Sequence, residues 1–339
     1  MFYVGLDIHT KQITVCVLDQ DGKVFERCQV RQLDQLQQRL ARLPGPFEVC
    51  FEASTGYGAF VEALSPLASR VVVAHPGHLK LIYRSRTKND RNDALRLAKL
   101  LYIDELPQVH VPSADVRAWR QLILFRSTLI QKRTRAKNGL RAVLRTVCIT
   151  APRRQGLWTR RGIEWLKSLQ FAQPSHALQR DMLLDELATL SQQIARVERE
   201  LARYSRDNTA VWQLRSIPGV GPRTSEAVVA FLDQPRRFAR AKQVGKYFGL
   251  IPCQDQSGDV NRLGHITREG PAVVRQLLTE AAWQAVRRSP TVRAYFERIQ
   301  RADKERRKIA LTATAHYLAR VMWAMLKHGT LWNEQRQAA

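Results

Sequence analysis

Short apolar runs dominate the start of the chain and predict β-strands. Residues 2–8 (FYVGLDI) and 12–18 (QITVCVL) are rich in β-branched and aromatic side chains. A turn at Asp21 and Gly22 then leads into a third apolar run, residues 24–30 (VFERCQV), as in a β-hairpin. The pattern therefore predicts three antiparallel strands.

Helical and strand spacing alternate after these strands. Leucines recur at helical spacing in residues 32–43, and the following Pro-Gly-Pro would end that helix. Residues 47–53 (FEVCFEA) predict a buried strand, residues 56–68 a helix, and residues 70–75 (RVVVAH) another strand. Antiparallel strands followed by alternating helices and strands predict a mixed α/β unit.

Beyond residue 110 the apolar positions follow helical spacing. Residues 115–148 combine this spacing with many Arg and Lys side chains. From 183 to 204 the spacing between apolar residues alternates between four and three, which is the heptad pattern of a coiled coil. We expect an antiparallel or intermolecular coiled coil here, with a helix packed in a bundle as the alternative.

Two further helical runs flank the turn IPGVG at residues 217–221. This pattern is typical of a helix-hairpin-helix, in which backbone N–H groups near Gly219 and Gly221 contact a nucleic-acid phosphate without reading sequence. A simple Pro-Gly connection between two helices is the alternative. The surrounding positive charge favours contact with DNA.

The charge balance indicates the kind of partner. The 339 residues include 55 Lys+Arg and 30 Asp+Glu, a net charge of +25 with a pI of about 10.7. A polyanionic partner, most often nucleic acid, is expected for such a protein. The charge is concentrated: residues 1–110 hold 14 basic and 12 acidic residues, 111–170 hold 14 and 2, 171–206 hold five of each, and 207–339 hold 22 and 11. These shifts predict four segments with those boundaries.

Cysteine usage and the absence of targeting signals favour a cytoplasmic protein. The five cysteines are scattered without a C-x-x-C pair, which argues against a zinc site and against disulfides. The N-terminus lacks a secretory signal, no apolar run approaches the ~18 residues of a membrane span, and no lipidation signal is visible. We expect no membrane association.

Four acidic residues form the first candidate site. Asp90 and Asp93 lie three apart in the basic stretch RSRTKNDRNDALRLAK, on one face of a predicted helix. Asp7 and Glu52 end the first and fourth predicted strands. Solvated ion pairs on a surface helix are the alternative. The layout, however, is that of a ribonuclease-H-like fold, whose carboxylates suit Mg²⁺ or Mn²⁺ for phosphoryl chemistry.

The second candidate site is the stretch GLIPCQDQSGDVNRLGHITREG, residues 249–270, which we interpret as a polar loop. Ser257 precedes a glycine there, so it could approach a phosphate closely and attack it if its proton is accepted. An ordinary turn is the alternative. Cys253 is a rival nucleophile, but no neighbouring residue marks it as activated.

The motifs VGLDIHT, FEASTGYG, TKNDRNDA, SIPGVGPRTS and GLIPCQDQSGDVNRLGHITREGP together resemble the transposases of the IS110 family of insertion sequences, DEDD recombinases known as bridge-RNA-guided. The resemblance covers nearly the whole chain. It implies that Asp7, Glu52, Asp90 and Asp93 are the metal-binding acids of a RuvC-like domain. It also implies that Ser257 is the catalytic serine of a C-terminal transposase domain.

The resemblance implies a fold of class α/β plus α. An RNase-H-like (RuvC-like) mixed sheet at 1–110 would precede a basic helical nucleic-acid-binding segment at 111–170 and a coiled coil at 171–206. A mainly helical transposase domain with a helix-hairpin-helix would follow at 207–339.

The resemblance also implies a reaction and its partners. The serine would attack a DNA phosphate, assisted by Mg²⁺ or Mn²⁺, and would leave a covalent phosphoserine. The implied partners are double-stranded donor and target DNA, a structured non-coding bridge RNA, and further copies of the chain in a dimer or tetramer that supplies the serine across a protomer interface. We expect the nucleic acid to contact Arg84, Arg86, Lys88, Arg91, Lys132, Arg133, Arg135, Lys137, Arg141, Gly219, Gly221, Arg262 and Arg268. The individual roles of His9, Arg262, His265 and Arg268 stay open.

Three other functions fit parts of the sequence. A metal-dependent Holliday-junction nuclease would use the acids and leave Ser257 passive. A non-enzymatic nucleic-acid-binding scaffold would use neither site. A sugar kinase or ATPase of the same superfold is a third alternative. The sequence lacks the second phosphate-binding loop of such an enzyme, and this function would not explain the positive charge.

Overall fold

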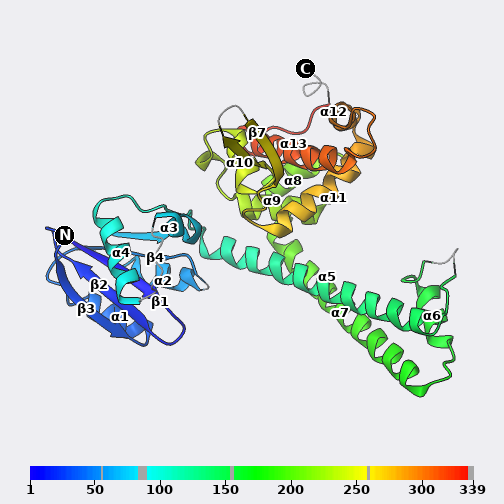
Figure 1. The fold of residues 1–339 in the computed structure, drawn as a ribbon, viewed down its shortest axis with the longest axis horizontal. Coiled ribbons are helices and arrows are strands. Elements are labelled where there is room, and N and C mark those ends of the chain that lie inside the picture. Colours follow the sequence, from blue (N-terminus) through cyan, green and yellow to red (C-terminus); the bar gives the residue numbers. More distant parts are fainter. Residues whose placement is uncertain (55, 83–89, 153–155, 258–259, 335–339) are drawn as a thin grey trace. The chain divides into compact units, whose positions relative to one another are not determined.

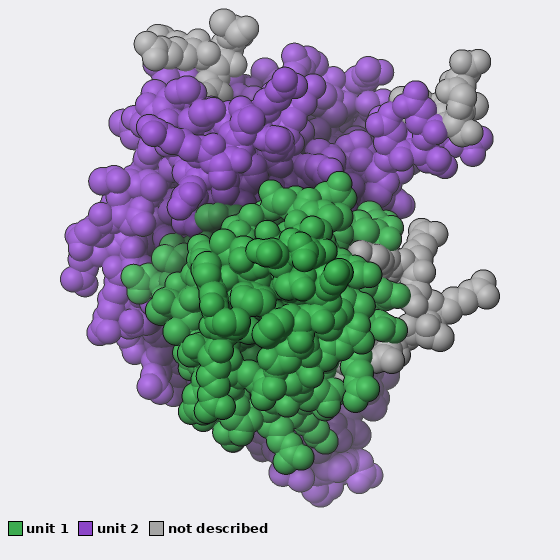
Figure 2. All heavy atoms as spheres, turned by 90° about the vertical axis from the view of Figure 1, so that its left-hand side faces the viewer, with its two compact units in different colours: residues 1–117 green, residues 118–339 purple. Residues whose placement is uncertain are grey.

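The computed structural model describes residues 1–54, 56–82, 90–152, 156–257 and 260–334. The chain divides into two compact units, residues 1–117 and 118–339 (Figure 2). The first unit is mixed α/β, and the second is mostly helical (Figure 1). The fold class predicted from the sequence, a mixed sheet followed by a mainly helical part, is therefore confirmed.

Within the described residues, the first unit contains a five-stranded sheet with the order β3-β2-β1-β4-β5. The pairing of β1 with β2 and of β2 with β3 is antiparallel, whereas β4 is parallel to both β1 and β5. The three predicted antiparallel strands are thus present. The strands are β1 (Phe2–Ile8), β2 (Ile13–Leu18), β3 (Val24–Val30), β4 (Phe47–Glu52) and β5 (Arg70–Ala74).

Helices cover both faces of this sheet. α1 (Leu33–Leu40) and α2 (Tyr57–Leu64) bury their leucines against one face. α4 (Asp90–Tyr102) packs against the other face, on β1, β2 and β4. α3 (Pro76–Ile82) follows β5 and was not predicted. Both faces are therefore covered, which explains why all six residues of β2 are buried.

A close approach between β1 and α4 fixes the position of that helix. Side chains alternate along a strand, so Val4 and Leu6 enter the core on the α1 and α2 side while Gly5 faces α4. A Cβ atom on Gly5 would lie 2.1 Å from the carbonyl oxygen of Ala94 and 2.5 Å from the backbone nitrogen of Ala98. Only glycine allows the helix to lie this close to the strand.

The second unit consists of a long helical hairpin and a compact helical domain. α5 (Ala114–Thr146), which begins at the end of the first unit, and α7 (Pro174–Arg206) form the hairpin, with α6 (Arg160–Ser168) near its far end (Figure 1). The remaining elements are α8 (Thr209–Arg215), α9 (Pro222–Leu232), the short 3₁₀ helix η1 (Pro235–Arg237), α10 (Ala241–Tyr247), β6 (Pro252–Ser257), β7 (Val260–Ile266), α11 (Ala272–Arg288), α12 (Pro290–Gln300) and α13 (Arg307–His328).

The heptad stripe of α7 is buried within the chain. Arg126 of α5 pairs with Glu198 of α7, and Leu183 packs against Gly139, so the two helices run antiparallel. Apolar residues of the stripe enter the cores shared with α5, namely Leu187, Leu190, Ile194, Val197 and Leu201. The stripe is therefore the seam of an intramolecular antiparallel pair.

The prediction of a polar loop at residues 249–270 was wrong. Residues 252–257 and 260–266 form the antiparallel hairpin β6–β7 instead. The described side chains of the two strands are nearly all exposed. Neither strand shows the alternation of apolar and polar residues that predicts a strand, because the side chains described for the hairpin have almost no buried members.

α13 is apolar enough, by length and composition, to cross a membrane, which the sequence analysis did not anticipate. Half of its most apolar window is buried, however, and Leu318, Ala319 and Met322 are fully enclosed. The helix packs against α8, α10, α11 and α12. It is the central core helix of the C-terminal domain.

Candidate active site

Two of the predicted acids end adjacent parallel strands. Asp7 is the next-to-last residue of β1, and Glu52 is the last residue of β4. The parallel register pairs Leu6 with Phe51, so Asp7 and Glu52 are the next residues along the two strands. Both belong to the alternate set of side chains that faces α4.

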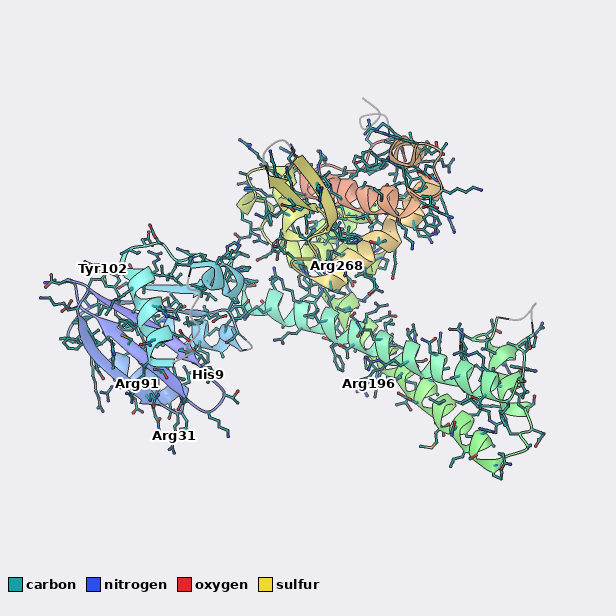
Figure 3. All side chains as sticks on the ribbon, viewed as in Figure 1. His9, Arg31, Arg91, Tyr102, Arg196 and Arg268 are labelled. Carbon is teal, nitrogen blue, oxygen red and sulfur yellow. The ribbon has the colours of Figure 1, made fainter. Side chains whose placement is uncertain are left out.

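The first turn of α4 lies at the same edge of the sheet. Tyr3 near the start of β1 contacts Tyr102 at the end of α4, with ring centroids 5.2 Å apart, while Gly5 contacts Ala94. The helix therefore runs antiparallel to β1, and its N-terminus reaches the carboxyl end of the strand. Figure 3 shows Arg91 and His9 at one end of the first unit and Tyr102 at the other.

α4 is also fastened to β4. The Cys50 thiol, which is fully buried, donates a hydrogen bond of 3.3 Å to the carbonyl oxygen of Leu97. Burial raises the pKa of this thiol well above its ordinary value, so it stays a neutral donor. Cys50 precedes Glu52 by two residues on the same face, which brings the end of β4 toward the first turn of α4. The ends of β1, β4 and α4 thus converge.

The described acids have local polar partners. Asp7 Oδ2 lies 3.1 Å from His9 Nε2, and Asp93 Oδ1 lies 3.1 Å from Arg96 Nη1. The side chain of Glu52 is exposed. Asp90 is the first residue of α4, and its side chain lies outside the described part of the structure. Among the side chains that are described, no group of three or more His, Cys, Asp or Glu has the proximity needed to hold a metal ion.

The basic residues expected around these acids are described only in part. Arg91 is exposed on the first turn of α4. Arg84, Arg86 and Lys88 lie outside the described residues. Of the four cations predicted near the acids, the structure therefore describes only Arg91.

Ser257 is the last residue of β6 and pairs with Val260 across the hairpin. Its side chain and residues 258–259 lie outside the described part of the structure. Arg262 is exposed opposite Asp255 in the register. Arg268 is also exposed and has a left-handed backbone with a φ of 57°.

Arg275, which the sequence analysis did not single out, clamps the base of this hairpin. Its Nη1 donates to the carbonyl oxygens of Phe248, Glu269 and Gly270, at 3.2, 2.5 and 3.1 Å. Burial, with a smaller effect of Arg268, lowers the pKa of its guanidinium, which nevertheless stays charged. The signal in the sequence was weak: an arginine in the first turn of a helix that follows Gly-Pro.

The predicted cations of α5 form an electropositive strip. Lys132, Arg135 and Arg141 are exposed, and Arg133 and Lys137 are half-buried. Lys137 Nζ and Arg141 Cζ lie 5.1 and 5.2 Å from the ring centroid of Trp158, an aromatic residue that was not predicted to contribute here. Burial and then repulsion by Arg133 and Arg141 lower the pKa of Lys137. Close like charges beside an aromatic ring are typical of nucleic-acid contacts.

The two glycines of the turn between α8 and α9 have different environments. Gly219 has a φ of 91°, and a Cβ atom there would lie 2.5 Å from the backbone nitrogen of Ala285 in α11. A Cβ atom on Gly221 would meet nothing within 4 Å. Gly219 is therefore required for packing, whereas Gly221 stands open at the N-terminus of α9. The helix-hairpin-helix role stays a prediction.

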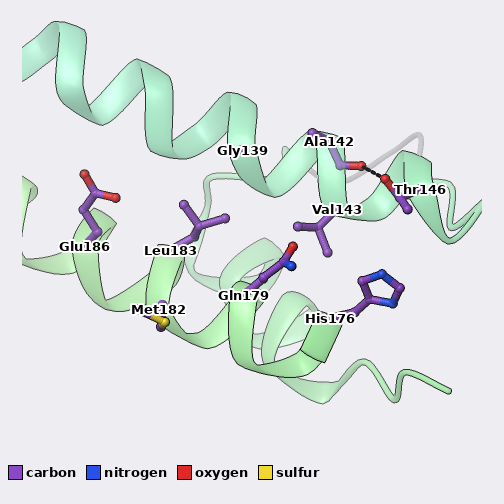
Figure 4. Close-up of a pocket in the computed structure, with 9 residues that line it drawn as sticks. All are labelled: Gly139, Ala142, Val143, Thr146, His176, Gln179, Met182, Leu183 and Glu186. Atoms are coloured by element: carbon purple, nitrogen blue, oxygen red, sulfur yellow. Dashed lines mark hydrogen bonds between the residues drawn. The ribbon is translucent and has the colours of Figure 1, made fainter. Parts of the chain in front are cut away.

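A pocket between α5 and α7 is unrelated to either candidate site. It has a volume of about 740 Å³ and is lined by residues such as Val143, His176, Met182 and Leu183 (Figure 4). The Thr146 hydroxyl donates back to the carbonyl oxygen of Ala142 at 3.1 Å. Its lining also includes Gln179 and Glu186, but none of the four predicted acids and not Ser257.

Comparison with known proteins gives matches in both halves of the chain. A family model described as a transposase, the DEDD transposase of IS110, matches residues 4–149. A second model, described as the transposase IS116/IS110/IS902 family, matches residues 212–297. The first match includes all four acids, and the second includes Ser257.

Curated relatives extend over nearly the full length. A probable family 20 transposase of Pseudomonas aeruginosa is 29% identical, over 97% of this chain and 98% of its own. The transposase for insertion sequence element IS1328 of Yersinia enterocolitica is 25% identical, over 98% of each chain. The transposase for insertion sequence element IS1111A of Coxiella burnetii is 26% identical, over 95% of this chain and 89% of its own.

Proposed function

The chain belongs to the IS110 family of insertion-sequence transposases, and we propose that it exchanges DNA strands through Ser257 with the help of a divalent metal held by four carboxylates. The observation that carries this proposal is the convergence of β1, β4 and the first turn of α4, the elements that bear the acids, at one edge of the sheet. A transposase acts on DNA, and the net charge of +25 suits that partner.

Asp7, Glu52, Asp90 and Asp93 would hold Mg²⁺ or Mn²⁺. Their carboxylate oxygens are the hard ligands that these ions prefer. When bound, such an ion neutralises charge that develops on the phosphoryl oxygens and orients the displaced group. His9 and Arg96 would hold the carboxylates of Asp7 and Asp93 until DNA and metal arrive.

Ser257 would supply the nucleophile. Its Oγ forms a bond to phosphorus while the bond between phosphorus and the leaving sugar oxygen breaks. The hydroxyl proton passes to a base or to water, and the leaving oxygen takes up a proton. Attack on the phosphoserine by the hydroxyl of a second strand reverses these steps and rejoins the DNA. The anchored hairpin β6–β7 supports this role, because Arg275 fixes both of its ends relative to α11.

The strip on α5 would bind a structured non-coding RNA of the bridge-RNA type. Contacts of Lys132, Arg135 and Arg141 with the backbone would give affinity without sequence specificity, and base pairing would supply the specificity. The adjacent Trp158 offers a ring for stacking. A homo-oligomer, either a dimer or a tetramer, would then bring Ser257 of one protomer to the acids of another.

A covalent adduct between protein and DNA tests the serine mechanism. The full-length protein, a DNA substrate containing element ends, the cognate RNA and Mg²⁺ are incubated and separated on a denaturing gel. We expect the adduct with the unaltered chain and its loss in Ser257→Ala. Cys253→Ser, in the same exposed strand, is the matched control and should retain the adduct. Cleavage by Ser257→Ala at the normal rate would overturn the proposal in favour of a Holliday-junction nuclease.

Metal binding by the acids has its own test. Calorimetric titration with Mg²⁺ should show binding to the unaltered chain and its loss when Asp7→Asn and Asp90→Asn are combined. Asp34→Asn, on the exposed surface of α1, is the control. Undiminished binding by the double variant would exclude these acids as the metal site and would favour a structural role for them.

A further inference from the structure

We infer that the C-terminal domain carries a nucleic-acid surface separate from the sites above, a cationic face around α12 that binds the phosphate backbone of double-stranded DNA. We name it the α12 face. The inference rests on the proposed function in one respect: we take the duplex bound by the α12 face to be the same DNA that reacts with Ser257. The α12 face consists of Arg287, Arg288, Arg298, Arg301, Lys304, Arg307 and Lys308.

The α12 face is dense in unpaired positive charge. Residues 287–308 contain nine basic and three acidic residues. All seven side chains of the face are exposed. Across the described ranges, no carboxylate lies within ion-pair distance of any of them. Uncompensated like charges repel one another, so this arrangement favours binding of a polyanion.

Aromatic rings hold part of the face in place. The guanidinium carbons of Arg287 and Arg307 lie 5.2 and 4.5 Å from the ring centroid of Trp283. These two arginines come from the end of α11 and the start of α13, so one ring joins cations of two helices. Such cation–π contacts restrain the side chains without neutralising their charge.

A second aromatic cluster restrains Arg298. Arg298 is 5.1 Å from the ring of Tyr295, which stacks on Tyr317 at 4.5 Å. Trp283 and Phe296 link α11 to α12, with ring centroids 6.5 Å apart. The face is therefore built on packed helices whose relative positions are fixed.

Two neighbouring arginines have structural roles and are not part of the face. Arg293 Nε donates to the carbonyl oxygen of Val286 at 3.0 Å, and Arg306 Nε donates to that of Ile299 at 3.3 Å. They satisfy carbonyl groups at the ends of α11 and α12. The seven cations of the α12 face, in contrast, donate to no carbonyl oxygen among the described residues, so they remain available to a ligand.

Duplex DNA is the partner that fits best. The α12 face belongs to the same compact unit as Ser257, which the proposed mechanism bonds to DNA. Figure 1 shows α12 and β7 at separate places on the C-terminal domain. The α12 face would therefore bind the duplex at a distance from the phosphate that Ser257 attacks. It would raise the affinity for DNA without taking part in the reaction.

Neutralising exposed members of the face tests the inference. The variant combines Arg288→Gln, Arg301→Gln, Lys304→Gln and Lys308→Gln, which leaves the cation–π arginines in place. The control removes four exposed cations from other surfaces of the same unit: Arg196, Arg199, Arg206 and Arg236, each to Gln. Arg196 is labelled on α7 in Figure 3. Both variants lose the same charge, and unchanged thermal unfolding verifies that they fold.

Affinity for a linear DNA duplex is measured by fluorescence anisotropy over a range of KCl concentrations. The logarithm of affinity falls with the logarithm of salt with a slope of about −0.9 per neutralised phosphate, so the α12 variant should have a slope shallower by about 2–4 and at least roughly tenfold weaker binding at low salt. The control should keep most of the original slope.

Three outcomes would overturn the inference. They are duplex binding equal to the control, a loss of equal size in both variants, and a loss confined to a structured RNA probe. Adduct formation at saturating DNA separates this inference from the proposed function. If duplex affinity falls while no adduct ever forms, the α12 face stands and the serine mechanism fails. If the adduct forms and duplex affinity is unchanged, the reverse holds.

Discussion

Replacing Gly5 with alanine should move α4 away from the sheet and disrupt the edge where β1, β4 and the first turn of α4, the elements that bear the acids, converge. The added Cβ would lie 2.1 Å from the carbonyl oxygen of Ala94 and 2.5 Å from the nitrogen of Ala98. Carbon and oxygen atoms in close contact are normally about 3.3 Å apart. Both clashing atoms belong to the backbone, so no side-chain rotation relieves them. The helix axis would have to move outward by about 1 Å.

The expected cost follows from what α4 buries. Ala94 and Ala98 are fully buried, and Leu97 and Leu101 belong to the core between α4 and the sheet. Overpacking a well-filled core typically costs about 1–3 kcal/mol, and a clash between two backbones belongs at the upper end or beyond. The first unit should therefore lose about 3 kcal/mol or more of unfolding free energy.

Hydrogen–deuterium exchange of the full-length chain, read in peptides covering β1 and α4, measures this effect locally. Exchange in α4 should become at least about a hundredfold faster, since each 1.4 kcal/mol of local stability is a factor of ten. Gly45→Ala is the control, because a Cβ there would meet only Phe2 at 3.6 Å, an ordinary contact. Unchanged exchange in Gly5→Ala would refute the close approach and, with it, the placement of the first turn of α4.

Three further predictions concern the second unit. Arg275→Gln should lower the unfolding free energy by about 1.5–3 kcal/mol, through loss of three carbonyl contacts, and should speed hydrogen exchange in β6–β7; intact protection there would contradict the clamp. Burial, with a smaller effect of Arg320, lowers the pKa of His316 below its ordinary 6.5, so below that pH the unfolded chain binds more protons and stability should fall as pH drops. Thermal unfolding between about pH 5 and 7.5 should show a flatter dependence in His316→Gln, and an identical slope would exclude this titration. Gly219→Ala should destabilise the domain through its clash with α11, whereas Gly221→Ala should leave the melting temperature within a few degrees and change only DNA affinity.

The first unit was predictable because its strands have distinct burial patterns. β2 is buried on both sides and therefore appears as a continuous apolar run, whereas β4 ends in an exposed glutamate that marks its boundary. The positions of Asp7 and Glu52 at strand ends follow directly from those runs. The antiparallel course of α4 across the sheet was not predictable, because it depends on the absence of a side chain at Gly5 and on tertiary contacts.

The second unit was predicted less completely for two physical reasons. Nearly all the described side chains of the hairpin β6–β7 are exposed, so its sequence lacks the alternation on which strand prediction depends. The heptad spacing of α7 specifies a partner helix but not its identity, because an intramolecular and an intermolecular seam require the same apolar residues. Arg275 was missed because its acceptors are backbone carbonyls, which leave no trace in the side-chain sequence.

The backbone fixes the positions of the four acids, whereas side-chain contacts set the direction of two of their carboxylates. The register of β1 and β4, and the contact of Gly5 with α4, fix where the four acids leave the backbone. The pairs of Asp7 with His9 and of Asp93 with Arg96 determine where two carboxylates point. Partly exposed ion pairs of this kind contribute only about 0–1 kcal/mol, whereas moving α4 costs several times more. A divalent cation bound as proposed would therefore displace only weak local pairs. The close packing of Gly5 against α4, rather than any individual ion pair, determines where the elements that bear the acids lie.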